Sequence, residues 1–196
     1  RHFMRLAVPA AIGMVFSTLY NVVDVFFAGM IGTDAQAGLA ISFQAFFLFV
    51  TIGFGLSSAM TALVGNAIGA KKTTNASIIA AQGIGFAIVT SVLLIVAARS
   101  IGPHLLAIIS TEGAYRTAGE AYFMVLILSL PGFIMGYGLN GILQAQGDTV
   151  SMQYALIGAF FANIGLNPLM MFGIPGIWGG LGFDGIAAAT VISQTG

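Results

Sequence analysis

A single acidic side chain interrupts an apolar stretch near the start of the sequence. Asp24 is the only charged residue between Leu6 and Gly32. A charge at the centre of a bilayer costs about 2.5–3.5 kcal/mol on insertion scales, so such residues usually face a cavity and mark an ion or substrate path. Burial disfavours the charged form of a carboxylate, which favours its binding a proton or a metal cation. We expect Asp24 to be a cation or proton site; the alternative is a purely structural acceptor of hydrogen bonds.

Further polar residues share a helix face with Asp24. Ser17, Tyr20 and Asn21 precede it at spacings of three and four residues, which place side chains on one side of a helix. A polar stripe of this kind is expected to face the protein interior rather than lipid. We therefore predict that these residues line or support a cavity.

A second polar group lies further along the chain. Asn163 and Asn167 are four residues apart, and Pro168 follows directly. Proline removes one backbone hydrogen bond of a helix and frees a carbonyl one turn earlier. Amide oxygens and freed carbonyls suit sodium or an ordered water, so Asp24, Asn163 and Asn167 form a candidate Na⁺ site. Interhelical hydrogen bonding is the alternative interpretation.

Five other residues are candidates for the same cavity or for its movement. Asn140 and Gln144 share a helix face and could line it. Thr190 could reach inward, or could bond its own backbone. Pro131 and Gly132 together predict a kink, which is either static or a hinge.

The sequence contains no recognisable catalytic set. Cysteine is absent, and His2 and His104 lie outside the apolar segments. Neither a serine–histidine–carboxylate set nor a phosphate-binding glycine loop is present. We therefore predict no enzyme activity, no cofactor and no nucleic-acid partner.

The amino-acid composition indicates that these polar residues belong to a membrane protein. Of 196 residues, 58% are hydrophobic and only 6% are charged, whereas a soluble domain carries about 25% charged residues. The chain is therefore predicted to be an all-α integral membrane protein, with lipid as its surroundings.

Long charge-free runs mark the predicted membrane-spanning helices. A helix needs about 20 apolar residues to cross a bilayer. We predict a bundle of six helices, at about residues 6–31, 38–66, 76–98, 118–145, 152–173 and 184–196. The sixth stops too early to span, so we expect the chain to be a piece of a longer protein. A short interfacial helix is predicted between the third and fourth spans, over Leu105 to Ile109.

The loops predict an orientation. Basic residues in loops are more frequent on the cytoplasmic side. Four lie on one side of the predicted bundle and two on the other: Arg1, Arg5, Lys71 and Lys72, against Arg99 and Arg116. This bias favours a cytoplasmic amino terminus.

Five patches of sequence resemble the multidrug and toxic compound extrusion (MATE) transporters. The first runs from Pro9 to Gly32 and contains Tyr-Asn-Val-Val-Asp ending at Asp24. The others are similar to later parts of the same family, in the same order: residues 65–72, 140–149, 163–168 and 185–190. Together they cover nearly the whole chain.

The resemblance implies a fold and an activity. MATE proteins have two lobes of six helices around a central cavity, and they export organic cations and other drugs in exchange for Na⁺ or H⁺. This chain resembles the amino-terminal lobe, without the carboxy-terminal one. In that lobe the family's cation site matches Asp24, Asn163, Asn167 and Thr190. Tyr20 and Asn140 match polar positions close to it.

The chain departs from the family pattern at two positions. At one, Gln144 stands where the family commonly carries a basic residue, which slightly weakens the positive bias of the cytoplasmic side. Members with a fully developed site in this lobe carry an aspartate where this chain has Asn167. One carboxylate instead of two leaves less negative charge to hold a cation. The residue at this position is therefore expected to influence the strength of the site and its choice of ion.

The functional prediction is a cation-coupled antiporter in a bacterial or archaeal cytoplasmic membrane. Neutralising Asp24 would let helices shift near Pro9, Pro131 and Pro168, which are predicted hinges, and so alter access to the cavity. A lipid-precursor flippase of the same superfamily is the first alternative, although no basic residue lies within a predicted span. A membrane-embedded transferase acting on a lipid-linked substrate is the second alternative.

Overall fold

The computed structural model describes residues 2–174 and 177–195, with side chains described for residue 12 and from residue 15 onward. Within these residues it is helical, with one isolated β-bridge between Ile174 and Trp178 and no strand. The elements are α1 (His2–Ile31), α2 (Thr33–Gly69), α3 (Thr73–Ile109), α4 (Ala114–Leu126), η1 (Ile127–Ser129), α5 (Leu130–Ala145), α6 (Ser151–Phe172) and α7 (Phe183–Thr195).

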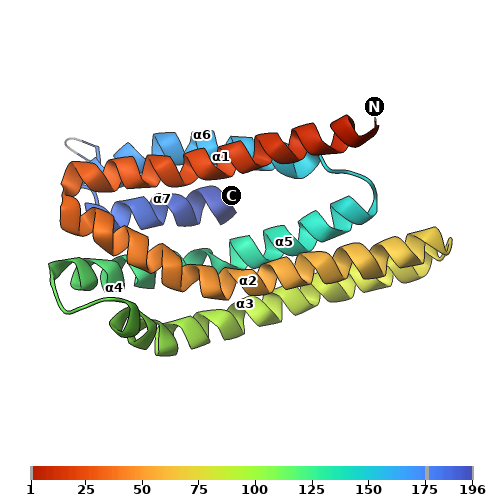
Figure 1. Ribbon diagram of the computed structural model, residues 1–196, viewed down its shortest axis with the longest axis horizontal. Helices are drawn as coiled ribbons and strands as arrows, with labels where there is room; N and C mark the ends of the chain where they lie inside the picture. Colours follow the sequence, from red (N-terminus) through yellow and green to blue (C-terminus); the bar gives the residue numbers. More distant parts are fainter. Residues whose placement is uncertain (1, 175–176, 196) are drawn as a thin grey trace.

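The helices form two groups that lie side by side (Figure 1). One group contains α1, α6 and α7, which pack on one another. In the other, α2 packs on α3, α4 and α5. Contacts of α1 with α2, and of α4 with α7, join the two groups.

The third helix is longer than the sequence predicts. It continues through Pro103 and ends at Ile109, so the separate interfacial helix predicted over Leu105 to Ile109 is wrong. Tertiary packing explains the difference, because Gly102 lies directly against the ring of Phe123 and Leu106 is fully buried. This packing offsets the hydrogen bond that Pro103 removes.

The predicted fourth helix is broken into two. A 3₁₀ turn, η1, separates α4 from α5, and Pro131 lies in the first turn of α5. Pro131 has no N–H to donate to the carbonyl of Ile127, four residues earlier. The N–H of Leu130 donates to that carbonyl instead, which tightens the chain into a 3₁₀ turn. The helix is thus irregular where Pro131 and Gly132 predict a kink, and the missing N–H of Pro131 explains the 3₁₀ turn.

Four helices of the described chain are long and apolar enough to cross a membrane: Thr33–Gly69, Thr73–Ile109, Ala114–Ala145 (with the 3₁₀ turn included) and Ser151–Phe172. The described apolar part of α1, Val15–Ile31, is shorter. At 1.5 Å per residue, α2 and α3 are each about 55 Å long, well beyond the roughly 30 Å of a hydrocarbon core.

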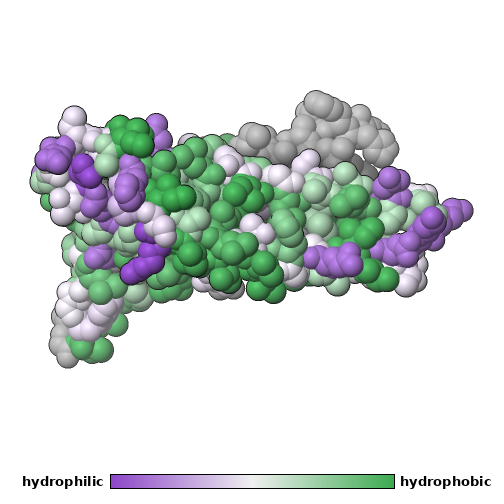
Figure 2. All heavy atoms as spheres, turned by 90° about the horizontal axis from the view of Figure 1, so that it is seen from below, coloured by the Kyte–Doolittle hydropathy of each residue, from purple (hydrophilic) through white to green (hydrophobic). Residues whose placement is uncertain are grey.

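Apolar and polar side chains are distributed over the surface as a membrane protein requires. In Figure 2, apolar side chains cover the middle of the face and polar ones gather at both ends. Phe86, Val89, Leu93 and Val96 of α3 are all more than half exposed. Large apolar side chains exposed in this way would be unfavourable in water, so this face is suited to lipid.

Candidate functional site

Asp24 lies where α1 meets α6 and α7, and its side chain is completely buried. Asn167 Nδ2 on α6 donates a hydrogen bond to one carboxylate oxygen, at 2.9 Å. Thr190 Oγ1 on α7 donates to the other, also at 2.9 Å. Asn167 Nδ2 donates in addition to Asn163 Oδ1, at 2.9 Å. The structure therefore brings together all four predicted cation-site residues, from three helices.

The carboxylate of Asp24 has no basic partner. In the described part of the chain the one ion pair joins Arg116 and Glu120, both on α4. Asp24 is instead held by neutral donors, an amide and a hydroxyl. A buried carboxylate without an opposite charge is costly unless a proton or a cation neutralises it. The arrangement is thus suited to taking up one positive charge.

Several buried polar atoms around Asp24 lack hydrogen-bond partners among the described residues. They are Asn163 Nδ2, Asn167 Oδ1 and the hydroxyl of Tyr122. Such groups are rare in native proteins and call for an explanation, such as a water or an ion. The unpaired oxygen of Asn167 is a suitable cation ligand, whereas the unpaired nitrogen of Asn163 suits a water molecule.

The set of donor atoms fits a monovalent cation. Carboxylate, amide and hydroxyl oxygens are hard ligands of the kind that alkali cations prefer. The set contains one formal negative charge, and no group of three or more His, Cys, Asp or Glu residues occurs among the residues described. A multivalent ion would lack the negative charge that it needs here, whereas Na⁺ or H⁺ would be balanced.

Tyr122 belongs to this region but was not predicted from the sequence. It is fully buried on α4, and its ring lies 4.9 Å from that of Phe183. Its hydroxyl is close enough to Asp24 and Thr190 to interact electrostatically with both. No polar stripe surrounds it in the sequence, so the available signal was only that a tyrosine in an apolar helix needs a partner for its hydroxyl.

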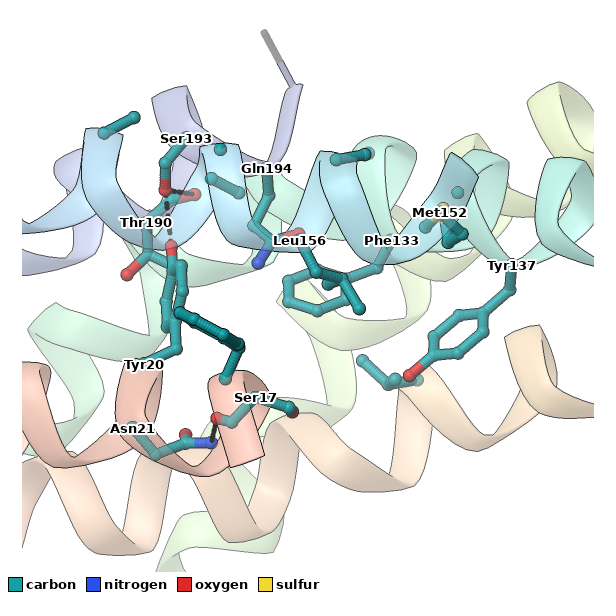
Figure 3. A pocket seen from close by; sticks show the side chains of 18 of the residues that line it. Ser17, Tyr20, Asn21, Phe133, Tyr137, Met152, Leu156, Thr190, Ser193 and Gln194 are labelled. Carbon is teal, nitrogen blue, oxygen red and sulfur yellow. Dashed lines mark hydrogen bonds between the residues drawn. The ribbon is translucent and has the colours of Figure 1, made fainter. Parts of the chain in front are cut away.

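A large pocket adjoins the site. Its volume is about 790 Å³, and it lies between the α1, α6 and α7 group and the α2 and α5 pair. Aromatic rings of α2 and α5 form one wall: Phe43, Phe46, Phe47, Phe54, Phe133 and Tyr137. Hydroxyl and amide side chains of α1 and α7 form much of the opposite wall: Ser17, Tyr20, Asn21, Thr190, Ser193 and Gln194 (Figure 3). None of the described lining residues carries a formal charge.

The predicted supporting residues fall into two sets. Ser17, Tyr20, Asn21 and Asn140 all line the pocket, and Asn21 Nδ2 donates to the Ser17 carbonyl at 2.9 Å. Gln144 does not belong to the lining: it is exposed, one turn beyond Asn140 on α5. The shared helix face did not predict this difference, because the pocket ends before that turn.

The three predicted hinge prolines have different surroundings. Pro131 begins α5, directly after the 3₁₀ turn. Pro168 lies inside α6, which remains helical to Phe172. The side chain of Pro9 lies outside the described residues.

Comparison with known proteins gives a family match over most of the chain. The model of the MatE family matches residues 9–169. A probable multidrug resistance protein of Bacillus subtilis, YoeA, is 27% identical over 98% of this chain and 42% of its own length. A probable multidrug resistance protein of Thermotoga maritima, NorM, is 28% identical over 99% of this chain and 42% of its own length. The chain thus spans less than half of these relatives.

Solved structures share the fold. An outward-facing multidrug resistance MATE family transporter of the MOP superfamily superposes with a TM-score of 0.86 at 24% identity, over 97% of this chain and 41% of that one. A MATE structure in a bent conformation gives a TM-score of 0.87 at the same identity, over 97% of this chain and 42% of that one. With these relatives, the apolar helices identify an integral membrane protein.

Proposed function

This chain belongs to the MatE family, and from that premise we propose that it is the amino-terminal lobe of a cation-coupled exporter of drugs and other organic compounds. The chain spans 42% of the length of the relatives named above, which is the share expected of one lobe. Those relatives are named as multidrug resistance proteins. In this proposal the second lobe completes the transport path.

The pocket is the proposed binding site for the exported compound. Its aromatic wall offers ring faces that stack on flat molecules and attract organic cations. The hydroxyl and amide groups of the opposite wall offer hydrogen bonds that fix orientation. The described lining contains no lysine or arginine, so it gives no support to a flippase that recognises phosphate.

The proposed coupling acts through Asp24. Its ionised carboxylate accepts hydrogen bonds from α6 and α7 at once, and hydrogen bonds to a charged group are stronger than those to a neutral one. Taking up H⁺ or Na⁺ changes the charge that holds these three helices together. The helices then favour another packing, and the pocket becomes open to the other side of the membrane. Pro131 and Pro168 are positions where α5 and α6 can bend.

One observation carries this proposal: a fully buried carboxylate, with no basic partner among the described residues, lies one helical turn from a residue that lines a large neutral pocket. Asp24 follows Tyr20 by four residues on α1, and Tyr20 lines that pocket. This arrangement permits the ion and the exported compound to affect each other without direct contact.

The test is dye efflux by the full-length protein in membrane vesicles, driven separately by a Na⁺ gradient and by a proton gradient. We expect Asp24→Asn to reduce efflux at least tenfold under whichever gradient drives the wild type, because the amide cannot take up a proton or balance a cation. Asp34→Asn, which changes an exposed carboxylate in the first turn of α2, is the matched control and should retain efflux. Membrane insertion of both variants is checked by immunoblot, and normal efflux by inserted Asp24→Asn would refute the proposal.

A further inference from the structure

Two pairs of polar side chains join α1 to α7. The inner pair is Asp24 and Thr190, with the threonine hydroxyl donating at 2.9 Å. The outer pair is Tyr20 and Ser193, whose hydroxyls are hydrogen-bonded to each other. Tyr20 precedes Asp24 by four residues, and Ser193 follows Thr190 by three. The two pairs are therefore about one helical turn apart along helices that run in opposite directions.

The outer pair lies between the pocket and the carboxylate. Tyr20 and Ser193 both line the pocket, whereas Asp24, Asn163 and Asn167 do not. Thr190 contributes to the lining, but its hydroxyl is bonded to Asp24. Figure 3 shows Tyr20 extending across from α1 to meet Ser193 on α7 at the pocket wall. Side chains of the outer pair are 8% and 9% exposed, and those of the inner pair are 0% exposed.

The hydroxyls of the outer pair form an ordered chain. Ser193 Oγ donates to the carbonyl of Thr190 at 3.2 Å, so the Tyr20 hydroxyl is the donor in the bond to Ser193. The bond thus ties the phenol ring of α1 to the same turn of α7 that carries Thr190. Its loss would remove the link between Tyr20 and Ser193, while the side chains of Thr190 and Gln194 remain close to the Tyr20 hydroxyl.

We propose that the Tyr20–Ser193 hydrogen bond closes the route from the pocket to Asp24, so that the carboxylate is reached from the pocket only when this bond opens. This inference deepens the proposed function and rests on it. A compound in the pocket that bonds with either hydroxyl competes with the pair and opens the route. Tyr20 and Ser193 are thus positioning residues, which link occupancy of the pocket to access at the carboxylate.

The test measures access to Asp24 directly. Dicyclohexylcarbodiimide is a hydrophobic reagent that reacts with buried protonated carboxyl groups. The full-length protein in detergent is treated at fixed pH, and labelling of Asp24 is followed over time by peptide mass spectrometry. The variants are Tyr20→Phe, Ser193→Ala and the double variant, with Asp24→Asn to verify the labelled peptide.

We expect slow labelling in the wild type and a rate about fivefold higher in each single variant, as for the loss of one hydrogen bond. The double variant should match the single ones, because all three lack the same bond. Ser193→Thr keeps a hydroxyl at this position, so this variant should be labelled as slowly as the wild type. The matched controls Tyr137→Phe and Ser17→Ala make the same chemical changes elsewhere in the pocket lining, and they should label at the wild-type rate.

Fast labelling of the wild type, or equal rates in wild type and pair variants, would overturn the inference. An equal increase in the two controls would do the same, because the effect would then be general to the pocket. The readout does not depend on transport. Normal efflux by Asp24→Asn would therefore refute the proposed function while leaving the labelling rates to be judged separately.

Discussion

At the scale of single residues, the chemistry of this protein centres on one buried negative charge. Asp24 is bonded to an amide and a hydroxyl, and no basic side chain pairs with it among the described residues. The side-chain nitrogen of Asn167 donates one hydrogen bond to a carboxylate oxygen of Asp24 and another to the amide oxygen of Asn163. The amide thus stabilises the site without a cation, which a second carboxylate in its place would not do.

This difference predicts the effect of Asn167→Asp. The substitution replaces a donor 2.9 Å from Asp24 Oδ1 with a second carboxylate, so the pair must share a proton or bind a cation. We expect the melting temperature of the full-length variant in detergent to rise with Na⁺ much more than that of the wild type. Sodium at a hundred times its Kd would raise the free energy of unfolding by about 2.7 kcal/mol.

The control for this prediction is Asn21→Asp. It makes the same change at an exposed position facing the pocket, one turn from Asp24. The melting temperature of this variant should change with Na⁺ as that of the wild type does. If Asn167→Asp also responds no more than the wild type, the site does not bind Na⁺ through these oxygens, and H⁺ remains the coupling ion to test.

At the scale of helices, close backbone contacts position the walls of the pocket. A Cβ added at Gly141 of α5 would collide with the backbone carbonyl of Ser57 and with Met60, both on α2. Because α2 and α5 together provide the aromatic wall, their close approach sets how the rings of that wall are arranged. Glycine is required here by the neighbouring backbone and not by its own φ.

We therefore expect Gly141→Ala to destabilise the protein by about 1–3 kcal/mol, as overpacking of a well-filled interior does. The measurement is thermal unfolding of the full-length protein in detergent. Gly55→Ala is the matched control, because a Cβ at that position of α2 meets no atom within 4 Å. It should be neutral or slightly stabilising, since alanine is favoured over glycine within a helix. Equal effects of the two changes would contradict the packing argument.

The start of α6 is held by a side chain in the preceding loop. Asp148 accepts hydrogen bonds from the backbone N–H groups of Val150 and Ser151, at 3.0 and 2.9 Å, and from the Ser151 hydroxyl. The side-chain bond from Ser151, with these backbone bonds, lowers the pKa of Asp148 below its ordinary value of 3.8. Its charged form also suits the positive end of the α6 dipole.

A pH dependence follows from this lowered pKa. A carboxyl whose pKa is lower in the folded state stabilises the fold fully above its unfolded pKa, and the contribution is lost as pH falls through the folded value. We expect Asp148→Asn to melt at a lower temperature than the wild type at neutral pH. The gap should close as the pH falls below about 3.8. A gap that is independent of pH would show that the charge of Asp148 does not contribute.

At the scale of the whole molecule, apolar side chains separate two polar ends on the face that Figure 2 shows. The amino-terminal end of α1, the turn between α2 and α3 and the connection from α5 to α6 lie at one end (Figure 1). Lys71 and Lys72 lie in that turn, whereas Glu112 and Arg116 lie near the start of α4 at the other end. The distribution of positive charge predicts that the end with the two lysines is cytoplasmic.

Cysteine labelling can test this orientation, since the chain has no cysteine of its own. Lys72→Cys and Glu112→Cys introduce thiols at exposed positions of opposite ends, in a full-length protein without other cysteines. In intact cells a membrane-impermeant maleimide should label Glu112→Cys and should label Lys72→Cys only after permeabilisation. The reverse pattern would show that the lobe is inserted with the opposite orientation.

The sequence by itself determined the class of the protein, the positions of most helices and the identity of the buried charge. These features depend on properties that are local in the chain. Apolar runs long enough for a bilayer become helices because their backbone groups must be paired within each segment. A carboxylate in such a run must turn toward the protein interior, and Pro131 must disturb the helix that contains it.

Only the tertiary structure decided which polar residues meet and where the pocket ends. Tyr122 comes close to Asp24 because α4 packs against α7, and Gln144 lies outside the pocket although it shares a face with Asn140. The pairing of Tyr20 with Ser193 likewise joins residues 173 positions apart. Such contacts depend on the angle and register at which helices pack, and these are set by side chains distributed over the whole bundle rather than by any local pattern.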